Sequence, residues 1–119
     1  MRLFVYGSLK RGFTAHDLLD GCQFIREAVA EGFQLYKIDW FPGMVQGTGK
    51  VYGELYDVPE AYVPVIDYFE CVNQGMFERV SIELDNQESA EVYLYRDNYD
   101  QNLLVETGRW THVEAERKA

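Results

Sequence analysis

The chain opens with MRLFVYGSLKRG, residues 1–12, and the rest of the sequence is organised around this stretch. Residues 3–5 form an apolar run that favours a strand, and the run stops at Gly7. A basic pair, Lys10 and Arg11, and a second glycine follow. Glycine lets the backbone approach a ligand closely, and successive N–H groups in such a turn can point at an anion. Two interpretations stay open from this stretch alone: a strand that ends in an ordinary turn, or a cradle for a phosphate or carboxylate group.

Composition limits the class of protein. A chain of 119 residues with 47% hydrophobic and 15% aromatic residues fits one globular domain and not a disordered segment. The 11 Lys and Arg residues are outnumbered by 20 Asp and Glu residues, which gives a formal net charge of −9. We therefore expect neither nucleic acid nor a membrane surface as the main partner, because both reward a basic face. A small acidic ligand held by a few local donors is compatible with this charge.

The cysteines and histidines give no sign of a disulfide framework or a metal site. Cys22 and Cys71 are too few for a disulfide scaffold, and no metal-type spacing joins them to His16 or His112. We expect both cysteines to remain free thiols that pack as small apolar residues, as in a protein of a reducing compartment. Neither a signal peptide nor a membrane-spanning stretch is evident, so the sequence favours a cytoplasmic protein. It offers no convincing site for a metal or cofactor. It predicts no particular oligomeric state.

Alternating apolar residues predict mostly strands, at about 22–31, 33–38, 51–58, 76–84 and 90–96, with turns at 39–43 and 46–49. Thr14 is expected to cap a short helix that ends near Gly21, with His16 as a structural residue or part of a pocket wall. The main helix is expected from about Ala61 to Cys71, with Pro64 in its first turn. These elements predict one α+β domain, residues 1–113, with a small mixed β-barrel-like sheet and flanking short helices. Residues 114–119 are expected to form a solvated tail.

The end of the main helix, IDYFE at residues 66–70, supplies the second half of a candidate site. A carboxylate held among Tyr, Phe and Val side chains is partly desolvated and can carry a proton near neutral pH, which makes Glu70 the candidate; the alternative is a solvated glutamate at a helix end. Asp67 is expected to face solvent or to cap the helix locally. Arg79 is expected either to neutralise a carboxylate across the sheet or to pair on the surface with a neighbouring glutamate.

These segments, taken in order, resemble the gamma-glutamylcyclotransferase-like proteins, a family that includes gamma-glutamylamine cyclotransferases and AIG2-like proteins. The resemblance lies in YGSL with the following RG at 6–12, and continues through FPGMV at 41–45, VYGELY at 51–56, IDYFE at 66–70 and GMFERV at 75–80. The sequence departs from the family at Phe77-Glu78, at Ala15 before His16, and at the loosely matching segment 107–110. These departures bear on substrate choice more than on catalysis.

The resemblance implies a reaction and the residues that perform it. Glu70 corresponds to the general base of the family, and Tyr6, Gly7, Ser8 and Leu9 correspond to its substrate-binding loop. In the implied reaction the alpha-amine of a gamma-glutamyl compound attacks its own gamma-carbonyl, which closes 5-oxoproline and releases an amine or amino acid. Such a reaction requires positioning and a base but no cofactor. A non-catalytic small-ligand-binding module of the same fold is the alternative. A structural barrel that uses its aromatic residues for oligomerisation is a third interpretation, and it leaves Gly7 and Glu70 unexplained.

Overall fold

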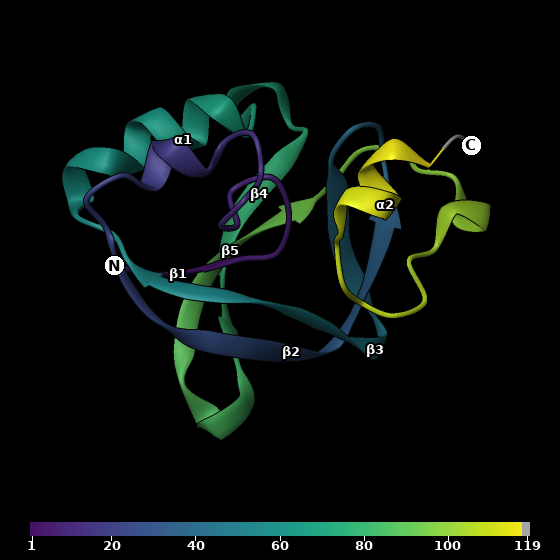
Figure 1. Cartoon of the computed structure of the whole chain (residues 1–119), viewed down its shortest axis with the longest axis horizontal. Helices are drawn as coiled ribbons and strands as arrows, with labels where there is room; N and C mark the ends of the chain where they lie inside the picture. Colours follow the sequence, from purple (N-terminus) through teal and green to yellow (C-terminus); the bar gives the residue numbers. More distant parts are fainter. Residues whose placement is uncertain (118–119) are drawn as a thin grey trace.

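The computed structural model describes residues 1–117, whose framework is a five-stranded mixed sheet in the order β2-β3-β1-β5-β4 (Figure 1). Strand β1 pairs antiparallel with β3 and parallel with β5, so the mixed sheet expected from the sequence is confirmed. Within the described residues the edge strands β2 and β4 do not pair with each other, and the curled sheet is therefore open and not a closed barrel. The strands are β1 (Arg2–Val5), β2 (Gln23–Lys37), β3 (Pro42–Asp57), β4 (Phe77–Glu83) and β5 (Ser89–Tyr95).

Strand β1 lies at the centre of the sheet and is covered on both faces. Leu3 and Val5 pack into one apolar cluster, beneath the helices that follow β1 and β3. Phe4 and Tyr6 pack into a second cluster with Trp110, inside the curl of the sheet. Because successive strand residues point to opposite faces, a short continuous apolar run is what such a doubly covered strand needs.

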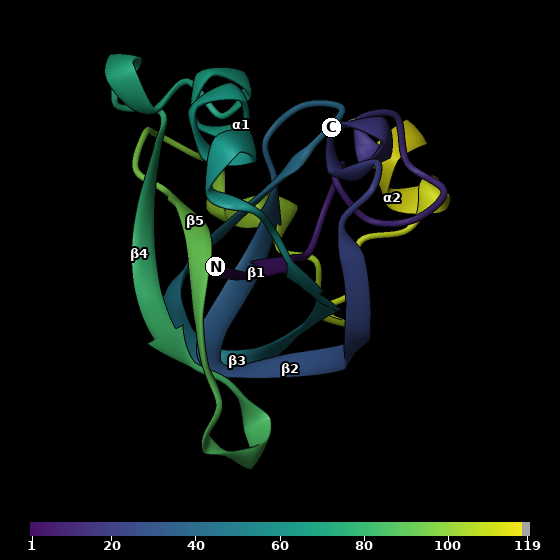
Figure 2. The ribbon, with the colours of Figure 1, turned by 90° about the vertical axis from the view of Figure 1, so that its left-hand side faces the viewer.

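The sequence divides β2 and β3 into shorter strands, whereas the structure shows one long, bent hairpin (Figure 2). The pairs Glu31–Lys50 and Phe33–Gln46 leave three residues of β3, 47–49, opposite Gly32 of β2. Gly32 has a φ of +87°, in the left-handed region that favours glycine. The turn expected at 46–49 is therefore wrong: these glycines form an irregular corner at which a continuous hairpin bends.

The main helix is shorter than expected. A 3-10 turn, η2 (Glu60–Tyr62), leads into α1 (Val63–Phe69), and Glu70 caps its C-terminal end. Pro64 lies in the first helical turn, as the sequence predicts. Val63 and Ile66 face the core, whereas Val65 is 55% exposed. A second 3-10 turn, η3 (Val72–Gln74), continues from the helix end towards β4.

The short helix after the opening loop is a 3-10 turn, η1 (His16–Leu19), and no side chain caps it. The cap expected from Thr14 is therefore wrong, since the residue at the N-cap position is Ala15. Leu19 of η1 and Ile66 of α1 pack into the same apolar cluster, and Figure 1 shows α2 (His112–Glu116) to the right of α1. Two further 3-10 turns, η4 (Asp85–Gln87) and η5 (Gln101–Leu103), connect the remaining segments. No helix among the described residues is long and apolar enough to cross a membrane.

The C-terminal segment packs more closely than its polar sequence suggests. Val105 and Trp110 are buried in the core inside the sheet. Helix α2 begins with a cap in which Thr111 Oγ1 accepts from the N–H of Glu114. Lys37 donates from Nζ to the carbonyls of Glu114 and Ala115, so this part of the expected solvated tail is held against β2. Lys118 and Ala119, the end of that expected tail, lie outside the described residues.

Candidate active site

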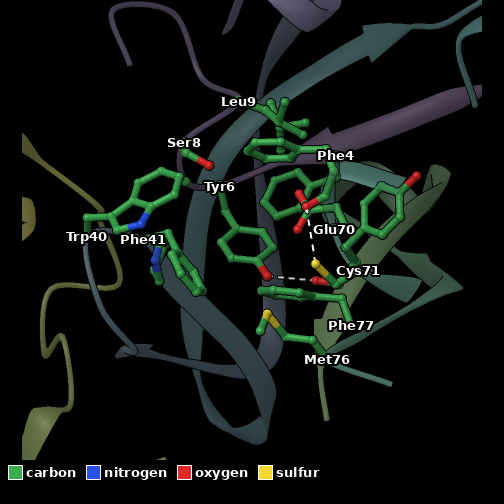
Figure 3. A pocket seen from close by; sticks show the side chains of 15 residues that line it. Phe4, Tyr6, Ser8, Leu9, Trp40, Phe41, Glu70, Cys71, Met76 and Phe77 are labelled. Atoms are coloured by element: carbon green, nitrogen blue, oxygen red, sulfur yellow. Dashed lines mark hydrogen bonds between the residues drawn. The ribbon is translucent and has the colours of Figure 1, made fainter. Parts of the chain in front are cut away.

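A cavity of about 190 Å³ opens where the loop after β1 meets the end of α1 (Figure 3). It brings together all five residues that the sequence singles out: Tyr6, Gly7, Ser8, Leu9 and Glu70. Loop and helix end lie about sixty residues apart in the chain, and they meet because β1 is central while α1 covers the same side of the sheet. The other lining residues are mostly apolar: Phe4, Val5, Trp40, Phe41, Pro42, Phe69, Cys71, Met76, Phe77 and Tyr93.

Glu70 is held in place by its backbone. Its N–H donates to the carbonyl of Ile66 at 2.9 Å, and the next residue, Cys71, adopts a left-handed conformation with a φ of +54°. Within residues 1–117 the Glu70 carboxylate has no hydrogen bond and no ion pair; the dashed line beside its label in Figure 3 joins Cys71 Sγ to the carbonyl of Phe69. Burial in this apolar setting raises the pKa of Glu70 to about 8. A carboxyl group with such a pKa exchanges a proton near neutral pH.

Asp67, one turn earlier on the same helix, has the opposite surroundings. Arg79 donates to it from Nε at 3.1 Å, and the hydroxyl of Tyr93 donates to it at 2.6 Å. The expectation that Asp67 faces solvent or caps the helix is wrong, because these donors tie it to β4 and β5. Arg79 also pairs with Glu91 at 3.1 Å, so the carboxylates that it neutralises are Asp67 and Glu91.

The hydroxyl of Tyr6 is fully engaged. It donates to the carbonyl of Tyr93 at 2.6 Å and accepts from the N–H of Met44 at 3.2 Å. Burial raises the pKa of Tyr6 well above its ordinary value, and the nearby carboxylate of Glu70 raises it further. Tyr6 is thus a neutral wall of the cavity whose proton is committed to the backbone of β5.

Gly7 sits where no side chain fits. A Cβ atom added to it would lie 2.6 Å from Cγ and 2.7 Å from Cδ of Pro42. Pro42 starts β3 and also lines the cavity. Glycine at this position is therefore required by the close packing of the loop against the start of β3.

In residues 7–9 the backbone carbonyls are engaged in hydrogen bonds, whereas, within the described residues, the N–H groups are not. All three carbonyls are already occupied, by the N–H of Lys10 at 3.0 Å, the N–H of Ala15 at 3.0 Å and Nδ1–H of His16 at 2.9 Å. No hydrogen bond within the described part of the chain uses the N–H groups of these three residues. His16 does not line the cavity; it braces the loop by binding the carbonyl of Leu9. The loop can therefore offer N–H donors to a carboxylate or an oxyanion.

The basic pair after the loop does not reach the cavity. Lys10 donates from Nζ to the carbonyl of Trp110 at 2.8 Å, and Arg11 pairs with Glu54 at 3.4 Å. Among the lining residues, all of which lie in the described part of the chain, Glu70 is the only Asp, Glu, Lys, Arg or His. Within residues 1–117 no group of three or more His, Cys, Asp and Glu side chains is arranged to hold a metal ion.

Several lining residues could not be identified from the sequence. Tyr93 stands within an ordinary alternating strand pattern, and nothing local marks it as part of a cavity. The family resemblance singles out the segments 41–45 and 75–80, and four of their members line the site: Phe41, Pro42, Met76 and Phe77. Cys71 gives no sequence signal either, although it follows Glu70 directly.

Comparisons with known proteins agree with this architecture. A family model described as "Gamma-glutamyl cyclotransferase, AIG2-like" matches residues 3–112. The chain is 32% identical over 110 residues to the "Gamma-glutamylcyclotransferase family protein YtfP" of Escherichia coli strain K12, across 92% of this chain and 96% of that protein.

Solved structures show the same fold. The crystal structure of the uncharacterized protein PH0828 from Pyrococcus horikoshii superposes with a TM-score of 0.80 and 27% identity, across 96% of this chain and 91% of that chain. The solution NMR structure of ytfP from Escherichia coli superposes with a TM-score of 0.73 and 34% identity, across 92% of this chain and 96% of that chain. The chain therefore belongs to the gamma-glutamyl cyclotransferase, AIG2-like family.

Proposed function

We propose that this protein is a cofactor-independent cyclotransferase that releases 5-oxoproline and an amine from a small gamma-glutamyl compound, with Glu70 as the general base. The observation that carries the proposal is the Glu70 carboxyl, with a pKa of about 8 and no partner within residues 1–117, in a cavity lined by residues 7–9, whose N–H groups make no hydrogen bond within the same described residues. Membership of the family supports the substrate class.

The reaction needs little beyond positioning and a base. The alpha-amine attacks the gamma-carbonyl carbon of the same molecule, a C–N bond forms within a five-membered ring, and the original amide C–N bond breaks. Holding the chain folded for this intramolecular attack contributes roughly 7–11 kcal/mol to lowering the barrier. Water is not consumed, because the nucleophile belongs to the substrate.

Glu70 supplies the proton transfer. Its carboxylate form removes a proton from the alpha-ammonium group, and its carboxyl form returns a proton to the nitrogen that leaves. A raised pKa favours both steps, because the carboxylate is then a stronger base and its conjugate acid exists close to neutral pH. A base of this kind contributes a rate factor of roughly 10²–10⁴.

The loop supplies the anion site. We assign the N–H groups of Gly7, Ser8 and Leu9 to the alpha-carboxylate or to the oxyanion that develops on the gamma-carbonyl. Tyr6 forms the wall that separates this site from the core.

Substitution of Gly7 by Ala should displace the loop from Pro42 and destabilise the fold by about 1–3 kcal/mol, and it should lower activity by more than its effect on folding accounts for. Thermal unfolding and turnover, measured on the same preparation, separate the two effects.

The direct test is product formation. Purified protein is incubated with a broad panel of gamma-glutamyl amides, gamma-glutamyl amino acids and gamma-glutamyl peptides, and 5-oxoproline is quantified by mass spectrometry. The Glu70→Gln variant, prepared in the same way, reports any contaminating activity. We expect 5-oxoproline from the native chain with at least one class of substrate. Its absence across the whole panel would refute the proposal.

One observation favours the second candidate, a binding module without chemistry. With a pKa of about 8, Glu70 is largely protonated at neutral pH, and a neutral carboxyl can donate a hydrogen bond to an amide ligand. This candidate predicts saturable binding of gamma-glutamyl compounds, measured by calorimetry, without any 5-oxoproline.

A further inference from the structure

The part of the cavity not assigned to the glutamyl group is aromatic. Trp40, Phe41, Met76 and Phe77 line it. The ring of Phe41 lies 5.1 Å from that of Trp40, edge to face, and 6.2 Å from that of Phe77. Trp40 is 49% exposed, although an aromatic side chain of this size is usually mostly buried. Figure 3 shows Trp40 and Phe41 on the opposite side of Tyr6 from Glu70.

No cation among residues 1–117 lines the same region to bind a carboxylate. No Lys, Arg or His is among the lining residues. Lys37, three residues before Trp40, donates from Nζ to three carbonyls, those of Asp39, Glu114 and Ala115, at 2.9, 3.0 and 3.1 Å. All three of its protons are therefore in use.

Two further arginines, Arg79 of β4 and Arg96 directly after β5, also have acidic partners. Arg79 binds Asp67 and Glu91, and Arg96 binds Glu78 at 2.8 Å. The chain as a whole carries a net charge of −9. A second carboxylate in the cavity would therefore enter the field of an acidic protein, and no cation among residues 1–117 lines the cavity to compensate it.

This distribution of charge and rings discriminates between leaving groups. A leaving amino acid carries a carboxylate, which would lose water in an apolar site without gaining an ion pair. A leaving amine with an apolar ring would instead bury that ring against Trp40 and Phe41, in the geometries that aromatic pairs prefer.

On the basis of the proposed function, we infer that the leaving group is an arylalkyl amine that bears no carboxylate, and that its ring packs on Trp40. In the balanced step, the bond between the alpha-nitrogen and the gamma-carbonyl carbon forms as the bond between that carbon and the amide nitrogen breaks. The proton from the alpha-ammonium passes through Glu70 to the amide nitrogen, which leaves as the free amine. Trp40 is thus a specificity-determining residue, and Glu70 remains the base.

Four synthetic substrates test the two halves of this inference. Gamma-glutamyl-phenethylamide and gamma-glutamyl-phenylalanine differ by one carboxylate, and so do gamma-glutamyl-ethylamide and gamma-glutamyl-alanine. The first pair carries a ring and the second does not. We expect kcat/KM for 5-oxoproline release to be at least about tenfold higher for each amide than for its carboxylate partner. We expect the phenethylamide to exceed the ethylamide by roughly 2- to 10-fold.

Variants of Trp40 test whether this residue sets the preference for a ring in the leaving group. Trp40→Ala should bring the ratio of phenethylamide to ethylamide close to one and leave the preference against carboxylates in place. Trp40→Arg should raise kcat/KM for gamma-glutamyl-phenylalanine relative to the phenethylamide, because it places a cation at the mouth. Tyr68→Ala is the matched control, since Tyr68 is 82% exposed and does not line the cavity, and it should change neither ratio.

The outcomes separate this inference from the proposed function. If gamma-glutamyl-phenylalanine is used as well as the phenethylamide or better, the inference is overturned while the cyclotransferase activity stands. The same holds if 5-oxoproline arises from other gamma-glutamyl compounds but not from the phenethylamide. An unchanged ring preference in Trp40→Ala overturns the role of Trp40. If no gamma-glutamyl compound yields 5-oxoproline, the proposed function itself fails.

Discussion

Helix α1 carries two carboxylates three residues apart, and their surroundings differ in every respect. Asp67 faces β4 and β5, where its carboxylate accepts hydrogen bonds from Arg79 and from the hydroxyl of Tyr93. Glu70 points to the cavity, where it has no partner within residues 1–117 and its pKa rises to about 8. The side chain of Asp67 is 28% exposed and that of Arg79 is 31% exposed, so this pair is sheltered but not desolvated.

The difference shows how environment assigns roles to similar groups. A carboxylate that is paired and hydrogen-bonded is held in its charged form and fixes a helix in position. A carboxylate that is buried without a partner is costly to ionise, and this cost gives it a proton affinity suited to catalysis. Asp67 holds α1 on the sheet, and that placement carries Glu70 to the cavity.

The largest expected effect separates the two residues by activity. Glu70→Gln should lower kcat/KM for 5-oxoproline release by roughly 10²–10⁴-fold, because the base is lost while the shape is kept. Asp67→Asn should cost far less activity, since its amide oxygen still accepts from Tyr93. Steady-state kinetics with one substrate decides the matter. Equal losses in both variants would break the distinction between a catalytic and a positioning carboxylate.

The second effect is a pH dependence of stability that belongs to Glu70. Its pKa in the folded protein, about 8, lies above its ordinary value of 4.5. Between these two pH values the folded chain keeps a proton that the unfolded chain has released, so the free energy of unfolding falls as pH rises. Glu70→Gln removes this loss. As the pH rises from 4.5 to 8, the free energy of unfolding of the variant should therefore increase relative to that of the native chain by a margin on the order of a few kcal/mol. Urea unfolding at several pH values measures the margin, and a margin that stays constant would contradict the account.

The third effect concerns stability alone. Asp67→Ala should lower the free energy of unfolding by about 1–3 kcal/mol, because Arg79 and Tyr93 each lose a charged hydrogen-bond acceptor. Glu78→Ala is the matched control: it removes the pair with Arg96, in which the glutamate is 59% exposed, and should cost less than about 1 kcal/mol. Similar losses in the two variants would show that Asp67 is no more than a surface charge.

The smallest expected effect is a change in stability at Cys71, which follows Glu70 and precedes β4. Cys71 has a φ of +54°, a conformation that costs a non-glycine residue about 1–2 kcal/mol. Cys71→Gly relieves this cost but makes the unfolded chain more flexible, so we expect a net change within about 1 kcal/mol of zero. Cys71→Val, a β-branched residue at the same φ, should be clearly less stable than Cys71→Gly. Thermal unfolding of both variants provides the comparison.

Local patterns predicted the fold class and the identity of the central elements. The apolar run of β1, the alternation of β4 and β5 and the proline in the first turn of α1 all follow from short-range rules. The long hairpin of β2 and β3 does not follow from such rules, because glycines at 47 and 49 are typical of a turn and of a bend in a strand equally. Which of the two forms depends on whether the flanking residues pair with the same partner strand, and that is a tertiary fact.

The candidate site was predictable in its two halves and not in its surroundings. Residues 6–9 and Glu70 were identified from the strand-to-glycine transition, the apolar helix end and the family resemblance. The partners of Asp67 were not, because Arg79 and Tyr93 lie on separate strands whose register is fixed only by folding. The destinations of Lys10 and Arg11 were also hidden, since a basic pair beside a loop has the same sequence whether it faces a ligand or, as here, Trp110 and Glu54.

The most direct test of the central claim is a titration of the Glu70 carboxyl by NMR. The chain is labelled with ¹³C in glutamate, the Glu70 carboxyl signal is assigned by its absence in Glu70→Gln, and its chemical shift is followed from pH 3 to pH 10. We predict a midpoint near 8, because the carboxyl lies partly buried in an apolar cavity and has no partner within residues 1–117. A midpoint near the ordinary value of 4.5 would mean that Glu70 is solvated or paired, and it would contradict the assignment of Glu70 as the base.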